Sequence, residues 1–413
     1  LAAVAAISTG AMAADKGVDL TTTGQAVIYY ETNDNGGDNG FFHKDQSQAN
    51  AALQLNVGGD LGNGFTLGTQ LSYIGTLGLE KNLVNGVKQF GGTDNDTAGT
   101  GATTTSTSEE LALSKIFVAK QIANTTLKLG RQELPKSLSP FAYSEGWNVF
   151  KNTFDAIVAI NTDIKDTTLV GAWVGSGNDS NDQGLSQMND LAGGLATKGA
   201  YMLTVANKSL PMTALTVSYY DVVSTADVAW VDAQIAGKDM PLGLSIGLQG
   251  GTVMTKGQLD GAEDTTSFGA KVAIKPVENL MLQVAYSTVD DGAVAIHNIG
   301  TNVKSPLYTQ MIYNQNHIKT DADTVVVKGA YSMGDMGKVI VNYNMTTDDR
   351  NAVAGVAVAE DYSELDLIYK VKAGGVTYWA SAMLRSLDRT AANKAAGLWE
   401  SDDRLRLWAR YNF

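Results

Sequence analysis

The sequence predicts an all-β protein, a transmembrane antiparallel β-barrel of 18 strands, and three observations lead to this prediction. First, segments in which apolar and polar side chains alternate recur along the whole chain, which is the pattern of strands that separate two environments. Second, the connectors between these segments alternate between long and short. Third, no run of 18 apolar residues is present, so the sequence contains no candidate for a transmembrane helix.

The chain begins with LAAVAAISTGAMAADKG, which has the composition of a secretory signal peptide. Leu1 to Ile7 would supply its apolar region, and Ala11-Met12-Ala13 fits an A-x-A cleavage site. We therefore expect residues 1–13 to be the remains of a cleaved signal peptide and not a short buried helix. Residues 14–413 are then expected to form a single transmembrane β-barrel domain.

Composition excludes several classes of protein. The 413 residues include no cysteine, which rules out a disulfide framework and thiolate metal sites. The net charge of −13 argues against nucleic acid as a partner, because phosphate binding needs clustered cations. Charged residues make up 18 % of the chain, below the roughly 25 % that is usual for soluble proteins.

The last strand, RLRLWARYNF at 404–413, shows the alternation most clearly. Leu405 and Leu407 point to one face, whereas Arg404, Arg406 and Arg410 point to the other. An arginine on the lipid side of a membrane barrel costs about 2–4 kcal/mol at mid-depth. We therefore expect the leucine face to meet lipid and the arginine face to line an aqueous lumen.

Comparable alternation occurs in other segments, among them 268–275, 280–287, 324–331 and 364–371. Two segments are less regular. In ELALSKIFVAK (110–120) the apolar residues change parity after Leu113, which predicts a β-bulge or a shift of face. In VAWVDAQI (228–235) apolar residues occupy both faces, so the facing of that strand stays ambiguous.

The connectors distinguish the predicted barrel from a soluble β-sandwich, because the loops of a sandwich would not alternate strictly between long and short. The short ones include 58–64, 121–125, 162–166, 275–279, 334–337 and 373–375. The long ones include 32–46, 76–108, 132–153, 176–198, 289–323, 347–361 and 386–401. A barrel in a bilayer must close, because an open edge would leave backbone groups unpaired in hydrocarbon. We expect long extracellular loops and short periplasmic turns.

The chain resembles a known family in LKLGRQELP (127–135), FDAIVAINTDIKDTTLVGAWV (154–174), LTVSYYDVVSTADVAWVDAQI (215–235) and the terminal RLRLWARYNF. In their order and spacing these stretches resemble 18-stranded bacterial outer-membrane porins of the OprD-like group, and most closely the major outer membrane proteins of epsilonproteobacteria. The resemblance implies a homotrimeric, water-filled diffusion channel in the outer membrane of a Gram-negative bacterium. It also implies that the third long loop folds into the lumen.

The third long loop, 132–153, has the apolar composition of a segment that packs against other parts of the protein. It carries large apolar side chains, namely Leu134, Leu138, Phe141, Trp147 and Phe150. We expect it to fold inward against the barrel wall and to form the constriction. The alternative is an external loop that packs on a neighbouring loop or subunit.

Selectivity in such a channel comes from pore radius and from charges at the narrowest point. The candidate cations are Arg404, Arg406, Arg410, Lys128, Arg131, Lys136 and Lys151. The candidate anions are Glu133, Glu145 and Asp155. Together they would create a transverse field across the pore. Arg131 shares the parity of Leu127 and Leu129, so it is also compatible with a position at the rim. For any single residue, simple solvation of the interior is the competing interpretation.

The sequence leaves the function open between a passive porin, a substrate-specific channel for small carboxylates or amino acids, and a surface adhesin with a plugged pore. We expect no enzymatic activity: Gly243-Leu244-Ser245-Ile246-Gly247 matches G-x-S-x-G but lies in a strand pattern. The expected partners are ions and small hydrophilic solutes, outer-membrane lipid and lipopolysaccharide. No cofactor is expected, although the acidic long loops could bind Ca²⁺. Cation or anion preference does not follow from the sequence.

Overall fold

The computed structural model describes residues 19–85, 109–178, 185, 187–196, 198–348, 361–389, 394 and 400–413. The expected signal peptide, residues 1–13, lies outside the described residues. The chain forms eighteen strands: β1 (Asp19–Asp34), β2 (Ser47–Gly62), β3 (Phe65–Gly75), β4 (Glu109–Ile122), β5 (Thr125–Gln132), β6 (Phe154–Asn161), β7 (Thr167–Gly177), β8 (Ala200–Asn207), β9 (Thr213–Val222), β10 (Ala226–Ala236), β11 (Ser245–Thr255), β12 (Thr265–Val277), β13 (Leu280–Val289), β14 (Ala322–Ser332), β15 (Lys338–Asp348), β16 (Asp361–Ala373), β17 (Val376–Asp388) and β18 (Asp403–Asn412).

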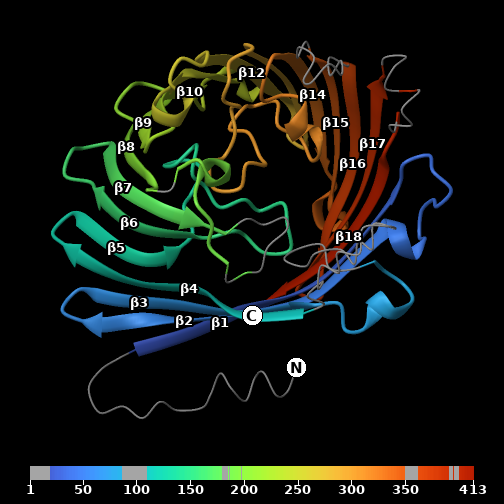
Figure 1. The fold of residues 1–413 in the computed structure, drawn as a ribbon, viewed down its shortest axis with the longest axis horizontal. Helices are drawn as coiled ribbons and strands as arrows, with labels where there is room; N and C mark the ends of the chain where they lie inside the picture. Colours follow the sequence, from blue (N-terminus) through green and yellow to red (C-terminus); the bar gives the residue numbers. More distant parts are fainter. Residues whose placement is uncertain are drawn as a thin grey trace.

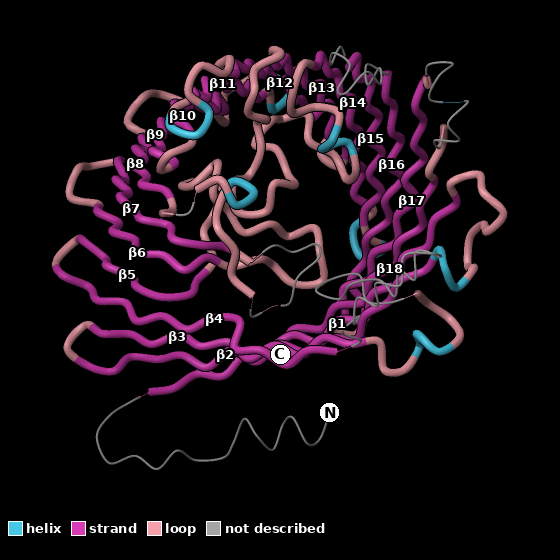
Figure 2. Tube along the Cα trace, in the orientation of Figure 1, coloured by secondary structure: helices cyan, strands magenta, loops and turns pink. Residues whose placement is uncertain are grey.

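The strands form one closed antiparallel barrel. Each strand pairs with the next along the chain, and β1 closes the ring by pairing with both β2 and β18. The β1–β18 pair runs from Gln25 opposite Asn412 to Asp34 opposite Asp403. Figure 1 and Figure 2 show the strands as a ring, with loop segments inside it. The predicted fold class is therefore confirmed.

The side chains face as the last strand predicts. In β18, Leu407 is 52 % exposed on the outer surface of the barrel, whereas its neighbour Arg406 is 4 % exposed and points inward. The outer face carries many exposed large apolar side chains, such as Ile28, Leu111 and Val284. A soluble protein would bury these side chains, so this arrangement suits a barrel surrounded by hydrocarbon.

The connectors alternate as predicted. The connector 162–166 joins β6 to β7, and the other short turns join β2 to β3, β4 to β5, β8 to β9, β10 to β11, β12 to β13, β14 to β15 and β16 to β17. Most connectors at the opposite rim are longer, with 223–225 and 256–264 the shortest of them. Short 3-10 turns lie in several connectors: η1 (Lys44–Gln46), η2 (Leu79–Lys81), η3 (Ala192–Gly194), η4 (Pro241–Gly243), η5 (Gly257–Leu259), η6 (Asn314–Asn316) and η7 (Gly334–Met336).

The predicted bulge lies at Ser114 in β4. The pairing with β3 passes from Leu71 opposite Leu113 to Gln70 opposite Lys115, so Ser114 has no opposite residue. The extra residue shifts the parity, because Leu113 and Ile116 both lie on the outer surface. Ser114 itself points inward and bonds Ser72 Oγ at 2.6 Å.

No helix among the described residues is long and apolar enough to cross a membrane.

Candidate pore constriction

Two loops fold into the lumen, and the first is the predicted one. Residues 133–153, between β5 and β6, lie inside the ring of strands (Figure 1). Phe141 of this loop packs edge-on against Trp230 of β10 and Tyr220 of β9, with ring centroids 5.1 and 5.8 Å apart. Val149 and Phe150 pack on the opposite part of the wall, against β1 to β4. The inward fold of the third long loop is thus confirmed.

This packing also resolves the ambiguous strand. In β10, Val231 is on the outer surface, whereas Val228 and Trp230 point inward and are almost fully buried. Both belong to the apolar cluster that includes Phe141. The inner face of this strand is apolar at Val228 and Trp230 because the inward loop covers it there, and the sequence pattern alone could not indicate that cover.

The second inward loop, residues 290–321 between β13 and β14, was not predicted from the sequence. Met311 packs on Ala285 and Val326 of the wall. Thr309 Oγ1 lies 2.6 Å from Ser287 Oγ of β13. The signal was present in the sequence, because this loop carries as many large apolar residues as the first one. Those that are buried are Ile296, Ile299, Leu307, Met311 and Ile318.

The two loops bind each other through Glu145. Its buried carboxylate accepts hydrogen bonds from Asn298 Nδ2 at 2.8 Å, Thr301 Oγ1 at 2.5 Å and the Lys304 backbone N–H at 3.2 Å. Lys304 Nζ in turn donates to the carbonyl oxygen of Ile312 at 2.6 Å. Burial lowers the pKa of Lys304 to about 8, although the nearby Glu145 opposes this effect. Glu145 therefore joins the loops and does not present a charge to the pore.

Arg404 and Arg406 lie beneath the second loop and are paired. Glu31 of β1 accepts from Arg406 Nε at 2.8 Å and from Arg404 Nη1 at 3.1 Å. The Tyr313 hydroxyl donates to Glu31 at 2.6 Å and accepts from Arg406 Nη2 at 2.7 Å. Arg404 also pairs with Asp402 at 2.8 Å. The wall arginines thus anchor loop 290–321 to the barrel.

A third arginine completes this group. Arg385 of β17 pairs with Asp402 and donates from Nε to the Asp402 carbonyl oxygen at 2.9 Å. Its guanidinium lies 4.7 Å from the centre of the Tyr313 ring, and that of Arg404 lies 4.6 Å from the same centre. We call Arg385, Arg404 and Arg406 the arginine cluster. Glu31 and Asp402 compensate two of its three positive charges.

The remaining predicted residues fall into different places. Arg410 donates to the Val149 carbonyl oxygen at 2.9 Å and so holds the first loop to the wall. Glu133 pairs with Lys115 of β4 and with Lys151, the latter at 3.0 Å. Burial raises the pKa of Glu133, but Lys115 and Lys151 together outweigh it and lower that pKa. The Lys151 side chain is 52 % exposed, so it is the most solvent-accessible charge of this group.

Lys128, Lys136, Arg131 and Asp155 lie apart from the arginine cluster. Lys128 lies over the inward Phe117 ring at 3.7 Å, and Lys136 Nζ donates to the Ser305 carbonyl oxygen at 3.3 Å. Arg131 and Asp155 pair at 2.9 Å, and both have the parity of outward-facing neighbours in β5 and β6. This pair therefore lies on the outer surface near the rim, which is the position that the parity of Arg131 allowed.

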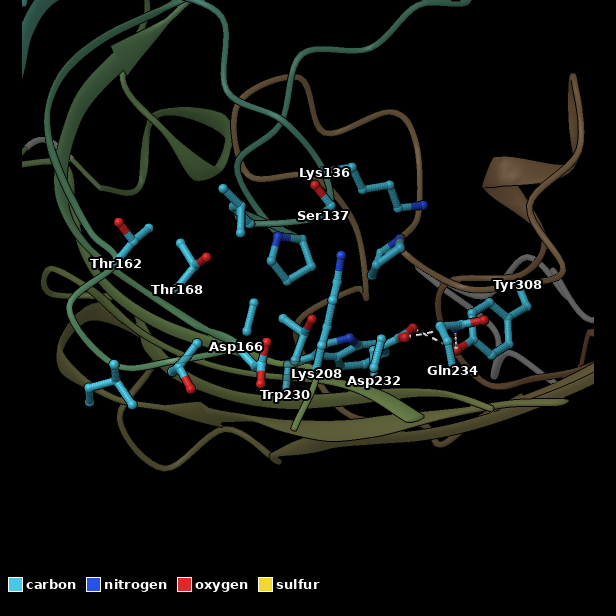
Figure 3. A pocket seen from close by; sticks show the side chains of 18 of the residues that line it. Lys136, Ser137, Thr162, Asp166, Thr168, Lys208, Trp230, Asp232, Gln234 and Tyr308 are labelled. Atoms are coloured by element: carbon cyan, nitrogen blue, oxygen red, sulfur yellow. Dashed lines mark hydrogen bonds between the residues drawn. The ribbon is translucent and has the colours of Figure 1, made fainter. Parts of the chain in front are cut away.

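A cavity of about 850 Å³ lies between the two loops and the inner wall. Figure 3 shows Lys136, from the first loop, across the cavity from Trp230 of β10 and from Lys208, which lies in the turn after β8. Tyr308 of the second loop donates to Asp232 Oδ2 at 2.6 Å. Lys271 lies 4.2 Å from the centre of the Tyr308 ring. The cavity lining is mixed: apolar side chains such as Leu138 and Trp230 alternate with hydroxyl groups, lysines and two aspartates, which suits a small solute with both apolar and polar parts.

No group of three or more His, Cys, Asp or Glu side chains is placed to hold a metal ion in the part of the chain that the structure describes.

These features define a membrane-spanning β-barrel whose lumen is narrowed by two inward loops. OccK8 (OprE) of Pseudomonas aeruginosa has the same fold, with a TM-score of 0.74, 14 % identity and coverage of 96 % of this chain and 98 % of that one. OccAB3 of Acinetobacter baumannii gives a TM-score of 0.76 at 14 % identity, with 96 % and 99 % covered. OccK2 (OpdF) of P. aeruginosa gives 0.73 at 15 %, with 96 % and 99 % covered. No protein-family model matches the sequence, and no curated protein matches it significantly.

Proposed function

We propose that the protein is an outer-membrane porin, a water-filled channel through which ions and small hydrophilic solutes diffuse. One observation carries the proposal: the barrel is closed, its outer surface is apolar, and its lumen holds charged side chains and two packed loops. Such a barrel separates hydrocarbon outside from water inside. The likeness in fold to the Occ structures supports an OprD-like channel, and the sequence resemblance favours the epsilonproteobacterial group.

A substrate-specific channel for small carboxylates is the second candidate. OpdK was crystallised with vanillate and OccK2 (OpdF) with glucuronate, and both ligands carry a carboxylate group. In this chain, four lysines and two aspartates border the cavity between the loops and the wall, namely Lys136, Lys165, Lys208, Lys271, Asp166 and Asp232. Four lysines against two aspartates leave the lining with an excess of positive charge, which favours anionic over cationic solutes.

Planar-bilayer recording tests the proposal directly. A porin gives stepwise conductance in KCl, whereas a plugged adhesin barrel of the same fold gives none. Liposome swelling with uncharged sugars of graded size then measures the limiting radius. If glucuronate enters liposomes no faster than glucose of similar size, the carboxylate-specific candidate is wrong, while the passive porin stands.

We further propose a homotrimer embedded in the outer membrane, in contact with lipopolysaccharide and exported with a cleaved signal peptide. Chemical cross-linking of the purified protein in detergent tests the trimer, and N-terminal sequencing of the protein from the membrane tests the cleavage. In this proposal the chain carries no catalytic chemistry. Ser245 of the G-x-S-x-G match begins β11 and not a helix, contrary to what a nucleophile elbow needs.

A further inference from the structure

Two carboxylates and two amides gather on the inner wall between β15 and β16. Asn342 lies directly opposite Asp366 in this ladder, and Asn344 lies directly opposite Glu364. The alternate residues of both strands carry exposed apolar side chains on the outer surface, so these four side chains point inward. Asn342 is 8 % exposed and the other three are fully buried. We call the four residues the acceptor cluster.

Three oxygen atoms of the acceptor cluster are buried without a hydrogen-bond donor in the described structure. They are Asp366 Oδ1, Asn342 Oδ1 and Asn344 Oδ1. The Asn342 side chain is directed at Asp366, since its Nδ2 lies 3.4 Å from Asp366 Oδ2. Asn344 Nδ2 donates to Thr346 Oγ1 at 2.8 Å. Buried acceptors almost always have a partner, and an exception calls for an explanation such as a bound ion.

The nearby ammonium group of Lys304 does not supply the missing donors. An ammonium group has three donors, and Lys304 uses all of them within its own loop. The acceptors are the carbonyl oxygens of Met311 and Ile312 and the side-chain oxygen of Gln315, at 3.2, 2.6 and 2.9 Å. Lys304 therefore holds loop 290–321 together and leaves the acceptor cluster without a donor.

Two cations on the neighbouring strands flank the cluster without pairing with it. Lys328 is opposite Asn342 in the β14–β15 ladder. Arg385 is opposite Glu364 in the β16–β17 ladder and pairs with Asp402. Among the described residues, no cation lies within ion-pair distance of either carboxylate of the cluster. The two carboxylates can therefore take a further cation, and the flanking charges keep its affinity moderate.

The spacing of the strands suits one ion shared by the four side chains. Directly opposite residues have Cβ atoms about 4.5–5.5 Å apart, and residues two apart on one strand are about 7 Å apart, so the centre of the cluster is about 4 Å from each Cβ. An Asp or Asn oxygen with a calcium–oxygen bond of about 2.3–2.6 Å spans that distance. Glu364 is one methylene longer. Each of its oxygens accepts one bond, from the Tyr313 backbone N–H and from the Tyr362 hydroxyl, both at 2.8 Å, and keeps a lone pair.

We propose that the acceptor cluster binds a hard divalent cation, Ca²⁺, through its two carboxylates and two amide oxygens. Carboxylate and Asn oxygens are ligands that calcium prefers, and water completes its shell. A water molecule alone would supply donors but no charge, and a proton shared by the carboxylates would satisfy only one of the three acceptors. The bound ion would also strengthen the attachment of loop 290–321, because Glu364 holds Tyr313 of that loop. The site rests on the water-filled lumen proposed above, from which the ion enters.

The test uses the full chain in detergent, with CaCl₂ as the probe and isothermal titration calorimetry as the readout. The wild type should bind calcium with a Kd of about 0.1–1 mM, the range of weak extracellular sites. Asp366→Asn keeps the size of the side chain, removes one ligand charge and should weaken binding by about tenfold. Asp335→Asn makes the same exchange in the exposed turn before β15 and should bind as the wild type does. Both variants keep the acidic long loops, so calcium held there does not distinguish them.

A gain of affinity provides a second variant. Asn344→Asp adds a charge at the position of an unpartnered amide oxygen and should tighten calcium binding by about tenfold. In urea unfolding in lipid vesicles, CaCl₂ at about ten times the Kd should raise the midpoint of the wild type and of Asp335→Asn, but not that of Asp366→Asn. MgCl₂ at the same concentration should raise it less, because magnesium gives up its water ligands reluctantly.

Equal calcium affinity in Asp366→Asn and Asp335→Asn would overturn the site, and so would an equal effect of magnesium and calcium. A wild-type midpoint that follows pH but not calcium would also overturn it, in favour of a shared proton. In planar bilayers, calcium should shift the reversal potential in KCl towards anions in the wild type and in Asp335→Asn only, because the bound ion adds positive charge to the wall. Calcium binding by calorimetry without any wild-type conductance would reject the channel and keep the site.

Discussion

Replacing Glu31 by Gln tests whether the wall arginines are structural. Glu31 is 3 % exposed and Arg406 is 4 % exposed, and Glu31 holds Arg406, Arg404 and the Tyr313 hydroxyl at once. Removing one member of a buried ion pair typically costs 3–5 kcal/mol, because the other charge stays buried and uncompensated. Glutamine keeps one acceptor oxygen, so we expect the lower end of this range, about 3 kcal/mol.

The assay is urea unfolding of the refolded barrel in lipid vesicles at pH 7, followed by tryptophan fluorescence. The double variant Glu31→Gln with Arg406→Met should lose less free energy of unfolding than the two single variants lose in sum. The difference should be about 1.5–3 kcal/mol, because the two residues share one network. Additive losses within 0.5 kcal/mol would refute the coupling. In bilayers, Glu31→Gln should also shift the reversal potential towards anions, since one compensating charge is gone. An unchanged midpoint of unfolding together with an unchanged reversal potential would show that the pairing described here is unimportant.

Three further predictions follow from exposed fractions, charge and pKa. Leu407→Lys places a charge on the outer face of β18 and should lower the stability of the barrel in the bilayer by about 2–4 kcal/mol. The loss should be seen as reduced insertion into vesicles, whereas the Leu407→Ile variant should insert normally. Lys151→Glu reverses an open charge beside Glu133 and should shift the reversal potential towards cations more than Arg410→Gln does; equal shifts would contradict the assignment. Burial, reinforced by Lys319, lowers the pKa of His297 to about 4, so this ring is neutral at pH 7. Since its unfolded pKa is about 6.5, stability present above pH 6.5 should be lost as the pH falls from 6.5 to 4, by at most about 3 kcal/mol. In His297→Gln the difference between urea midpoints at pH 7 and pH 4.5 should be smaller than in the wild type.

The barrel could be predicted from the sequence because its physics is local. Strand alternation and connector length are properties of consecutive residues, and both can be recognised without knowledge of tertiary contacts. Even the bulge at Ser114 was visible as a change of parity between Leu113 and Ile116. The inward loop 133–153 was predicted by its apolar content, and the same criterion applied to 290–321 would have found the second loop.

The candidate site was only partly predictable, because parity says which way a side chain points and not what it meets. Arg404 and Arg406 have lumen-facing parity, yet the structure places both under loop 290–321 with Glu31, a residue more than 370 positions away. Glu145 lies in the predicted constriction loop, but its partners Asn298, Thr301 and Lys304 come from the loop that was not predicted.

By itself, the sequence determined the class of fold, the facing of the regularly alternating strands and the alternation of the connectors. These follow from the two-residue period of a strand and from the cost of placing charge in hydrocarbon. Only the tertiary structure decided which charges are free. Barrel closure brings β1 beside β18, and the inward loops cover one set of cations while leaving others open to the lumen. Compensation of charge depends on distances between residues far apart in the chain, and a pattern of neighbouring residues contains no information about those distances.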